Sequence, residues 1–435
     1  MREHRPYHEY RTTRPRLLPR AVAAILLALT GACNSLLGVD NPGRVPSSAL
    51  SDPALAPTLE ASALGTFECA YANYIVTAGV LTMEYITSNS FVNSNVWGWR
   101  GNEVKQEAGS CPNSRTATSL GFYTPMQSAR FQAEDAVTRI NAFADADVPN
   151  RLRMLAELSA YEGYSLVLLG EGMCSMTVDN GPEMTREETF KLAVQKVTDA
   201  LNFAKQAPAN DAAVTDIVNM THVGLARAYL DLGDLANAAT NAQLVPAGYA
   251  RISEYSESQP VRENRVYNMN VRNDFLSVGP NYRGLTVGGK PDPRVKVVDM
   301  GRLGQDQVTR QWDQQKITGN GAAPINLATY AEAQLIYAEA VAGTNAQAAK
   351  DAINRVRAQW SIAPLDGSEG SDLTAVVLEE RRRQFFSEGQ RLGDMLRKNI
   401  PFPQGVNLKN QLYGPTTCVP LPDVETHNNP NFQGK

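Results

Sequence analysis

Apolar residues recur every three or four positions through most of this 435-residue chain, which is the pattern of amphipathic helices. The spacing begins near residue 59 and returns at 121–143, at 150–169 and at 189–207. Each of these segments is long enough for a stable helix in a folded protein. The pattern therefore predicts a mainly α protein, with about half of its residues in helix and very few in strand.

Two alanine-rich segments each predict a pair of packed helices. Residues 224–239 place small side chains on both sides of Gly233, and residues 328–359 do so on both sides of Gly343. Glycine permits a tight turn, and alanine lets two helix backbones approach closely. Both segments resemble tetratricopeptide units, so we predict a scaffold of tetratricopeptide-like helical hairpins.

Two stretches of the chain lack the helical period. Residues 88–118 are rich in Asn, Ser and Gly and are expected to form a loop. Residues 246–325 are dominated by Pro, Gly, Asn and Arg, with short strand-like pieces. A long irregular segment inside a helical protein is usually functional or disordered. Because 246–325 also carries several aromatic residues, we expect an ordered, functional, loop-rich insertion.

The first 32 residues are expected to be an export signal. Arginines precede a ten-residue apolar run from Ala21 to Thr30, and small residues then lead to Cys33. This order is typical of a secretory signal, and the run is too short to span a bilayer. Small residues that end on Cys resemble the bacterial lipobox, where cleavage precedes lipid attachment to the cysteine, although Thr30 stands where Leu is usual. We predict a signal peptide over 1–32, lipidation of Cys33 and an extended leash over 33–57. An ordinary signal peptide, with Cys33 incidental, is the alternative.

Export to an oxidising compartment gives the other four cysteines a role. Their even number predicts two disulfides, and the sequence leaves all three pairings open. The candidates are Cys69, Cys111, Cys174 and Cys418. A metal site is the weaker alternative because no C-x-x-C pair is present, and no cofactor is predicted. The formal net charge of -4 argues against nucleic acid as a partner.

The most specific pattern lies at residues 378–397, which read LEERRRQFFSEGQRLGDMLR. It resembles the C-terminal signature of the SusD/RagB family of outer-membrane lipoproteins, ERRxELxxEGxRxxDL, with Gln384 in place of one family Glu. The segment AINRVR at 352–357 and the ending that starts at Val419 also fit the family pattern. The resemblance spans the mature chain and implies one SusD-like helical binding domain over 58–435, with an irregular region at about 246–325.

The resemblance also implies a function. It predicts a cell-surface lipoprotein of the outer membrane that binds a nutrient, above all an oligosaccharide, as the lid and partner of a SusC-like TonB-dependent transporter. The alternative is a helical-repeat envelope scaffold that binds only protein partners. No G-x-S-x-G, H-E-x-x-H or Walker A motif is present, and the mature chain has only two histidines, His222 and His427. We therefore predict a protein that is not an enzyme.

Sugar binding needs flat aromatic faces together with planar polar side chains. The segment FVNSNVWGWRGN at 91–102 supplies both, and its two tryptophans would share one face of an extended segment. The irregular region supplies further aromatic residues. The predicted ligand contacts are Trp97, Trp99, Arg100, Asn95, Tyr282 and Trp312. Burial of the tryptophans in the core is the alternative.

The charged residues of the signature are expected to be structural. Glu388, Arg391 and Asp394 are three positions apart, which places them on one face of a helix. Together with Glu380 and Arg381, they predict a structural ion-pair network beside a buried apolar face.

Overall fold

The computed structural model describes residues 47–208 and 210–432; the predicted signal peptide, Cys33 and the leash up to residue 46 lie outside the described residues. The chain divides into two units, Met1–Ser51 and Asp52–Lys435. In the first unit, Ser47–Ser51 form the 3₁₀ helix η1. All further description concerns the second unit by itself.

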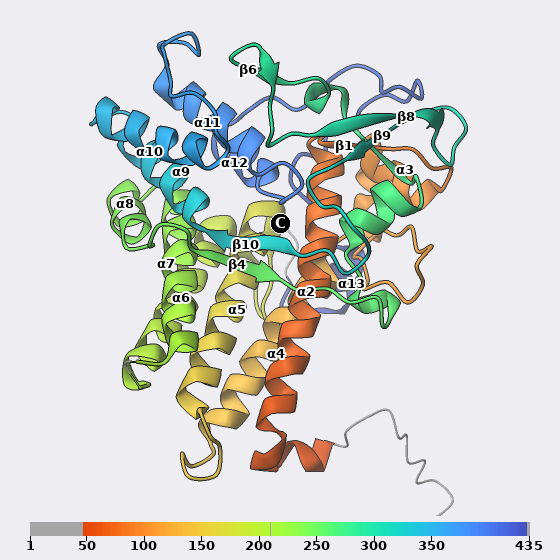
Figure 1. Ribbon diagram of the computed structural model, residues 1–435. Helices are drawn as coiled ribbons and strands as arrows, with labels where there is room; N and C mark the ends of the chain where they lie inside the picture. Colours follow the sequence, from red (N-terminus) through yellow and green to blue (C-terminus); the bar gives the residue numbers. More distant parts are fainter. Residues whose placement is uncertain (1–46, 209, 433–435) are drawn as a thin grey trace, which may run out of the picture. The chain divides into compact units, whose positions relative to one another are not determined.

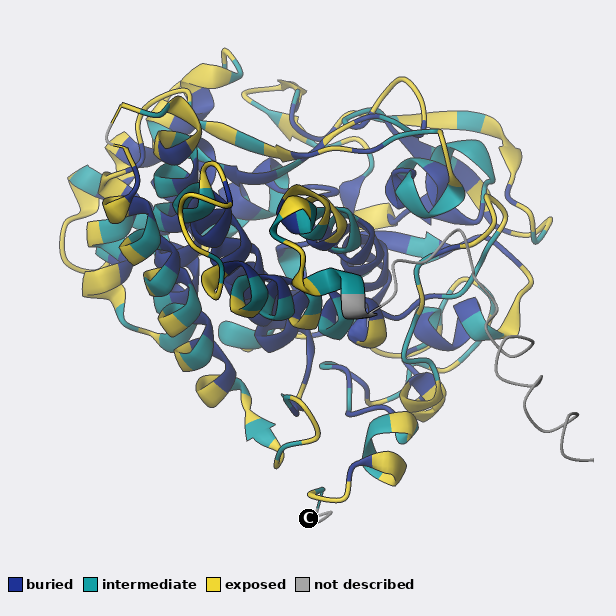
Figure 2. Ribbon diagram, turned by 90° about the horizontal axis from the view of Figure 1, so that it is seen from below, coloured by how far each residue is buried: buried dark blue, intermediate teal, exposed yellow. Residues whose placement is uncertain are grey.

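Five long helices lie side by side and form the main helical layer (Figure 1). In chain order they are α2 (Ala56–Leu81), α4 (Tyr123–Asn141), α5 (Arg151–Gly172), α6 (Arg186–Gln206) and α7 (Ala212–Leu232). Helix α5 packs against α4 on one side and α6 on the other, so it is buried along most of its length. Figure 2 shows the buried residues concentrated between neighbouring helices and the exposed residues along the outer turns and loops.

Both predicted helical hairpins are present. The first joins α7 to α8 (Leu235–Gln243) through Gly233, whose φ of 76° is the left-handed conformation that glycine adopts without strain. The second joins α9 (Tyr330–Val341) to α10 (Ala346–Gln359), and the Asn345 side chain caps α10 by accepting a hydrogen bond from the Ala348 N–H. Helices occupy about half of the described residues, which confirms the mainly α, hairpin-based fold.

The described strands are short and pair two by two, all antiparallel. They are β1 (Tyr85–Thr87) with β5 (Leu276–Val278), β4 (Ala250–Ser253) with β10 (Ile325–Thr329), β8 (Val297–Leu303) with β9 (Arg310–Gln314), β2 (Ser175–Met176) with β3 (Met184–Thr185), and β6 (Thr286–Val287) with β7 (Lys290–Pro291). The β4–β10 pair joins the two ends of the irregular region, so this region leaves and re-enters the helical scaffold at one place (Figure 1).

Two local predictions are wrong. Residues 88–118 are not a continuous loop, because they contain helix α3 (Val92–Gly98) and the 3₁₀ helix η3 (Asn102–Gln106). Successive residues of a helix rotate by about 100°, so Trp97 and Trp99 do not share a face as they would in an extended segment.

The signature segment is not one continuous helix. It forms α11 (Leu373–Gln384) and α12 (Arg391–Arg397), because Ser387 and Gly389 take left-handed conformations with φ of 64° and 81°. Glu388 therefore lies in a turn, off the helical face that the spacing predicted. The remaining short helices are η2 (Pro53–Leu55), η4 (Pro260–Arg262), η5 (Tyr267–Arg272), η6 (Pro280–Tyr282) and α13 (Asp423–Asn428).

Two disulfides are present, and the structure resolves the pairing that the sequence left open. Cys69 in α2 is bonded to Cys111, 42 residues further on. Cys174, just after α5, is bonded to Cys418 near the C-terminus, 244 residues further on. Within the part of the chain that the structure describes, no helix is both long and apolar enough to cross a membrane.

Candidate functional site

Four of the six predicted ligand contacts are buried in the core. Trp97 has no exposed surface, and Asn95 is buried with both amide atoms hydrogen-bonded inside the protein. Arg100 is 1% exposed, and its guanidinium lies against the rings of Phe402 and Tyr413. A ligand has no surface of these side chains to contact, so the structure assigns them to packing.

Tyr282 is the fourth buried residue. Its ring stacks on Phe386, with 5.2 Å between centroids, and the guanidinium of Arg382 lies 4.9 Å from its centroid. Trp99 and Trp312 are half-buried, and the guanidinium of Arg283 covers Trp312 at 4.9 Å. For these two tryptophans, ligand contact stays a prediction.

An open groove of about 690 Å³ lies beside the second helical hairpin. Its walls come from four parts of the chain: the loop leading into β4 (residues 247–250), the junction of β10 with α9 (326–331), the last turn of α10 (355–360), and Gln384 at the end of α11. The β4–β10 ladder brings the first two together, since the Tyr330 N–H donates to the Tyr249 carbonyl at 2.9 Å.

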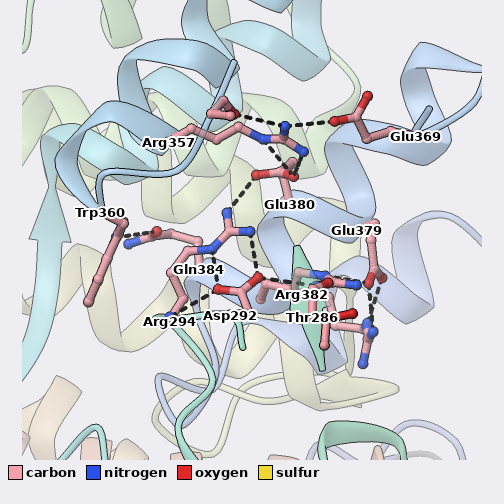
Figure 3. Close-up of polar contacts among 12 residues, drawn as sticks. Thr286, Asp292, Arg294, Arg357, Trp360, Glu369, Glu379, Glu380, Arg382 and Gln384 are labelled. Carbon is pink, nitrogen blue, oxygen red and sulfur yellow. Dashed lines mark hydrogen bonds and ion pairs between the residues drawn. The ribbon is translucent and has the colours of Figure 1, made fainter. Parts of the chain in front are cut away.

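Three half-buried aromatic side chains line this groove: Tyr249, Tyr330 and Trp360. Trp360 is the C-cap residue of α10, and its indole N–H donates to Oε1 of Gln384 at 2.9 Å, as Figure 3 shows. The Tyr249 hydroxyl donates to the Asp216 carbonyl at 3.0 Å. These bonds orient the two rings, so the groove presents aromatic surface that is already in place.

Planar polar side chains stand beside the rings. Gln384 is buried, whereas Arg355 is exposed and donates through Nε to Oε1 of Gln334 at 2.7 Å. A second cavity, of about 550 Å³, shares Tyr330 and Arg355 with the groove and continues to Gln334 and Tyr337. The two cavities together combine aromatic faces with amides and a guanidinium, which is a chemistry suited to sugars.

Buried ion pairs hold α11 in place behind the groove. Glu380 accepts from Arg294 at 2.5 Å and from Arg357 at 2.7 Å, and all three side chains are buried (Figure 3). The next residue of α11, Arg381, pairs with Asp394 of α12 at 2.9 Å. Because a buried pair is costly to break on one side, these contacts fix the backbone that presents Gln384.

The other two residues of the predicted network differ from each other. Glu388 pairs with Lys316 at 2.8 Å, and Lys316 also donates to the Gln384 carbonyl. Arg391, in the first turn of α12, takes part in none of the ion pairs found among the described residues. Among those residues, no group of three or more His, Cys, Asp or Glu is arranged to hold a metal ion.

The fold and the groove define a helical-hairpin protein with an open binding surface. Residues 223–414 match the model of the SusD family. The fold is similar to a SusD superfamily protein from Bacteroides fragilis, at 14% identity over 87% of this chain and 99% of that one, with a TM-score of 0.62. The chain therefore carries a segment that matches the SusD family, over residues 223–414, and shares its fold with SusD superfamily proteins.

Two further solved structures share the fold. One is described as a laminarin-binding SusD-like protein, with 14% identity, 86% and 98% coverage and a TM-score of 0.61. The other is surface glycan-binding protein A from Bacteroides thetaiotaomicron, with 12% identity, 86% and 97% coverage and a TM-score of 0.60. No curated protein sequence matches the chain. At these identities the solved structures show a common fold.

The sequence predictions missed every residue that lines the groove. Trp360 stands three residues after the end of the AINRVR segment, and Tyr330 opens the second hairpin, so both stand at positions that the hairpin pattern locates. An aromatic residue at the end of an amphipathic helix is a usable signal. The groove residues Tyr249 and Gln384 are each more than twenty residues from Trp360 in sequence. No local spacing therefore indicates that these side chains meet.

Proposed function

We propose that this protein binds oligosaccharides at the cell surface, in the groove around Trp360, and releases them unchanged. The observation that carries the proposal is the half-exposed Trp360 ring, held by Gln384 beside Tyr330 in an open cavity. The C–H face of a pyranose ring packs against such an aromatic surface, while amides and a guanidinium bind its hydroxyls. The glycan-binding names of two proteins with the same fold support this reading.

We further propose that the protein is a lipid-anchored partner of a SusC-like TonB-dependent outer-membrane transporter. The predicted lipobox at Cys33, which lies outside the described residues, supports the anchor, and the two disulfides are consistent with export. The match to the SusD family supports the transporter as partner. A lid that shares a membrane with its transporter gains from high effective concentration, so the groove needs only modest affinity.

The binding site is tested by glycan array and then by calorimetry on the mature chain carrying Cys33→Ser. We expect Trp360→Ala to weaken binding of the best array ligand at least tenfold, because it removes the stacking surface. Its melting temperature should change little, since the ring is only half-buried.

Trp312→Ala is the matched control, because Trp312 is also half-buried but lies outside the groove. It should leave binding unchanged. If Trp312→Ala or Trp99→Ala abolishes binding while Trp360→Ala does not, the site lies at the tryptophans that the sequence predicted. An array without any bound glycan, combined with recovery of protein partners, would favour the envelope scaffold.

The anchor and the absence of catalysis have their own measurements. Radiolabelled palmitate should enter the protein in cells, and Cys33→Ala should abolish the incorporation.

Incubation of the purified protein with its array ligand should give no shorter products by chromatography. A shortened glycan would contradict the binding role directly.

A further inference from the structure

Two buried glutamines, one in the groove and one in the second cavity, have an amide orientation that their partners determine. Gln384 is 5% exposed and accepts a hydrogen bond from the indole N–H of Trp360, while Gln334 is 6% exposed and accepts one from Nε of Arg355. Indole and guanidinium nitrogens are donors only, so each must face the amide oxygen and not the amide nitrogen. The NH₂ group of each glutamine is therefore not used in these two hydrogen bonds and can donate elsewhere.

Both glutamines line cavities. Gln384 borders the 690 Å³ groove and Gln334 borders the 550 Å³ cavity, and neither Nε2 is hydrogen-bonded to any of the described residues. Arg355 borders both cavities, and its two Nη atoms likewise have no partner among the described residues. None of these nitrogens is among the buried polar atoms that lack a partner, so they reach the solvent of the cavities, where a ligand that accepts hydrogen bonds can replace water.

The two cavities are continuous along α9. Tyr330, Gln334 and Tyr337 follow one another at spacings of four and three, which places them on one face of the helix. Tyr330 belongs to both cavities and Tyr337 to the second. Seven helical residues rise about 10 Å, so this stripe is long enough to contact more than one sugar ring.

We infer that this continuous groove selects oligosaccharides that carry carboxylates, that is, glycans containing uronic acids. The inference rests on the proposed glycan binding and adds the class of glycan. A carboxylate offers acceptors only, and the planar guanidinium of Arg355 matches its geometry. Neutral sugars present hydroxyl groups that both donate and accept. They therefore match the hydrogen-bond donors of this groove less well than a carboxylate does.

The acidic groups near Arg355 set the place of the carboxylate. Asp351 precedes Arg355 by one turn of α10 and lines the second cavity, where its Oδ1 accepts from Gln347 at 2.8 Å. The charge of Asp351 repels an anion at its end of the groove. The sugar carboxylate therefore binds on the other side of Arg355, towards Gln384.

The test compares ligands that differ only in charge. Uronic-acid oligosaccharides and their carboxyl-reduced counterparts are titrated into the mature Cys33→Ser chain by calorimetry at low salt. We expect the acidic form to bind about fivefold to tenfold more tightly, the gain of a charge-assisted over a neutral hydrogen bond. The preference should shrink as sodium chloride is raised.

Three variants locate the effect. Arg355→Gln should remove the preference for the acidic form, and Asp351→Asn should raise the affinity for that form by removing a repelling charge. Arg302→Gln removes an exposed positive charge on β8, outside the groove, and should leave the preference as it is.

The outcomes separate this inference from the proposed function. Equal affinity for both forms, binding of neutral glycans alone, or a preference that survives Arg355→Gln overturns the selection of uronic acids. If Trp360→Ala still weakens binding in that case, glycan binding in the groove stands. If no glycan of either kind binds, both conclusions fail.

Discussion

At the scale of single residues, buried carboxyl groups give this protein a stability that depends on pH. Glu84 is 1% exposed, and burial raises its pKa to about 7, although the backbone N–H of Ser387 donates to it. Burial likewise raises the pKa of Glu332 to about 7. In each case the folded state binds the proton more tightly than the unfolded chain does. Ionisation therefore destabilises the fold as the pH rises from about 4.5 to 7.

Glu84→Gln tests this sign. The amide carries no charge to desolvate, so relative to wild type the variant should gain up to about 3 kcal/mol in unfolding free energy between pH 5 and pH 8. Urea unfolding at the two pH values measures the change. Glu103→Gln, at an exposed position, should show no such gain. A variant whose stability follows wild type in parallel across this range would show that Glu84 does not titrate there.

At the scale of helices and strands, the sequence predicted elements that depend on local spacing and missed those that depend on backbone conformation. The hairpin turn at Gly233 was predictable, because the small residues on both sides of it mark two packed helices. The break between α11 and α12 was not, since the charged residues there keep helical spacing through Ser387 and Gly389. Helix α3 was missed because Asn and Ser, common in loops, also occur in short buried helices.

The packing of α5 against α6 depends on a residue without a side chain. A Cβ on Gly163 of α5 would lie 2.3 Å from the Val197 side chain of α6 and 3.4 Å from the Ala193 carbonyl oxygen. We expect Gly163→Ala to lower the unfolding free energy by about 1–3 kcal/mol, because overpacking moves α5 away from α6. Gly343→Ala is the control, since a Cβ there meets nothing within 4 Å. Equal denaturation midpoints for the two variants would contradict this account.

At the scale of the whole molecule, the groove depends on long-range contacts that spacing does not encode. Tyr249 and Tyr330 meet through the β4–β10 ladder, and Trp360 reaches Gln384 through the packing of α11 on the second hairpin. The predicted ligand contacts drew on tryptophan and asparagine content, and that composition also suits a core: Trp97 and Asn95 are buried. Composition correctly indicated that sugar binding needs aromatic and amide side chains. Which of these side chains line the groove depends on tertiary contacts.

The two disulfides should contribute unequally to the stability of the molecule. Replacing Cys174 and Cys418 with Ser should lower the unfolding free energy by about 2–5 kcal/mol, because the bond closes a segment of 244 residues. Replacing Cys69 and Cys111 should cost less, since that bond closes only 42 residues. Guanidinium unfolding of the two double variants measures the difference. A larger loss for the shorter segment would contradict the loop-closure argument.

The longer bond has a further consequence when a protease cuts the chain. The exposed β6–β7 hairpin lies between Cys174 and Cys418, so a single nick there leaves both fragments in one covalent molecule. Tyr249 would belong to one fragment and Trp360 to the other, although both line the same groove. The nicked protein would migrate as one band until a thiol reductant separates it into two.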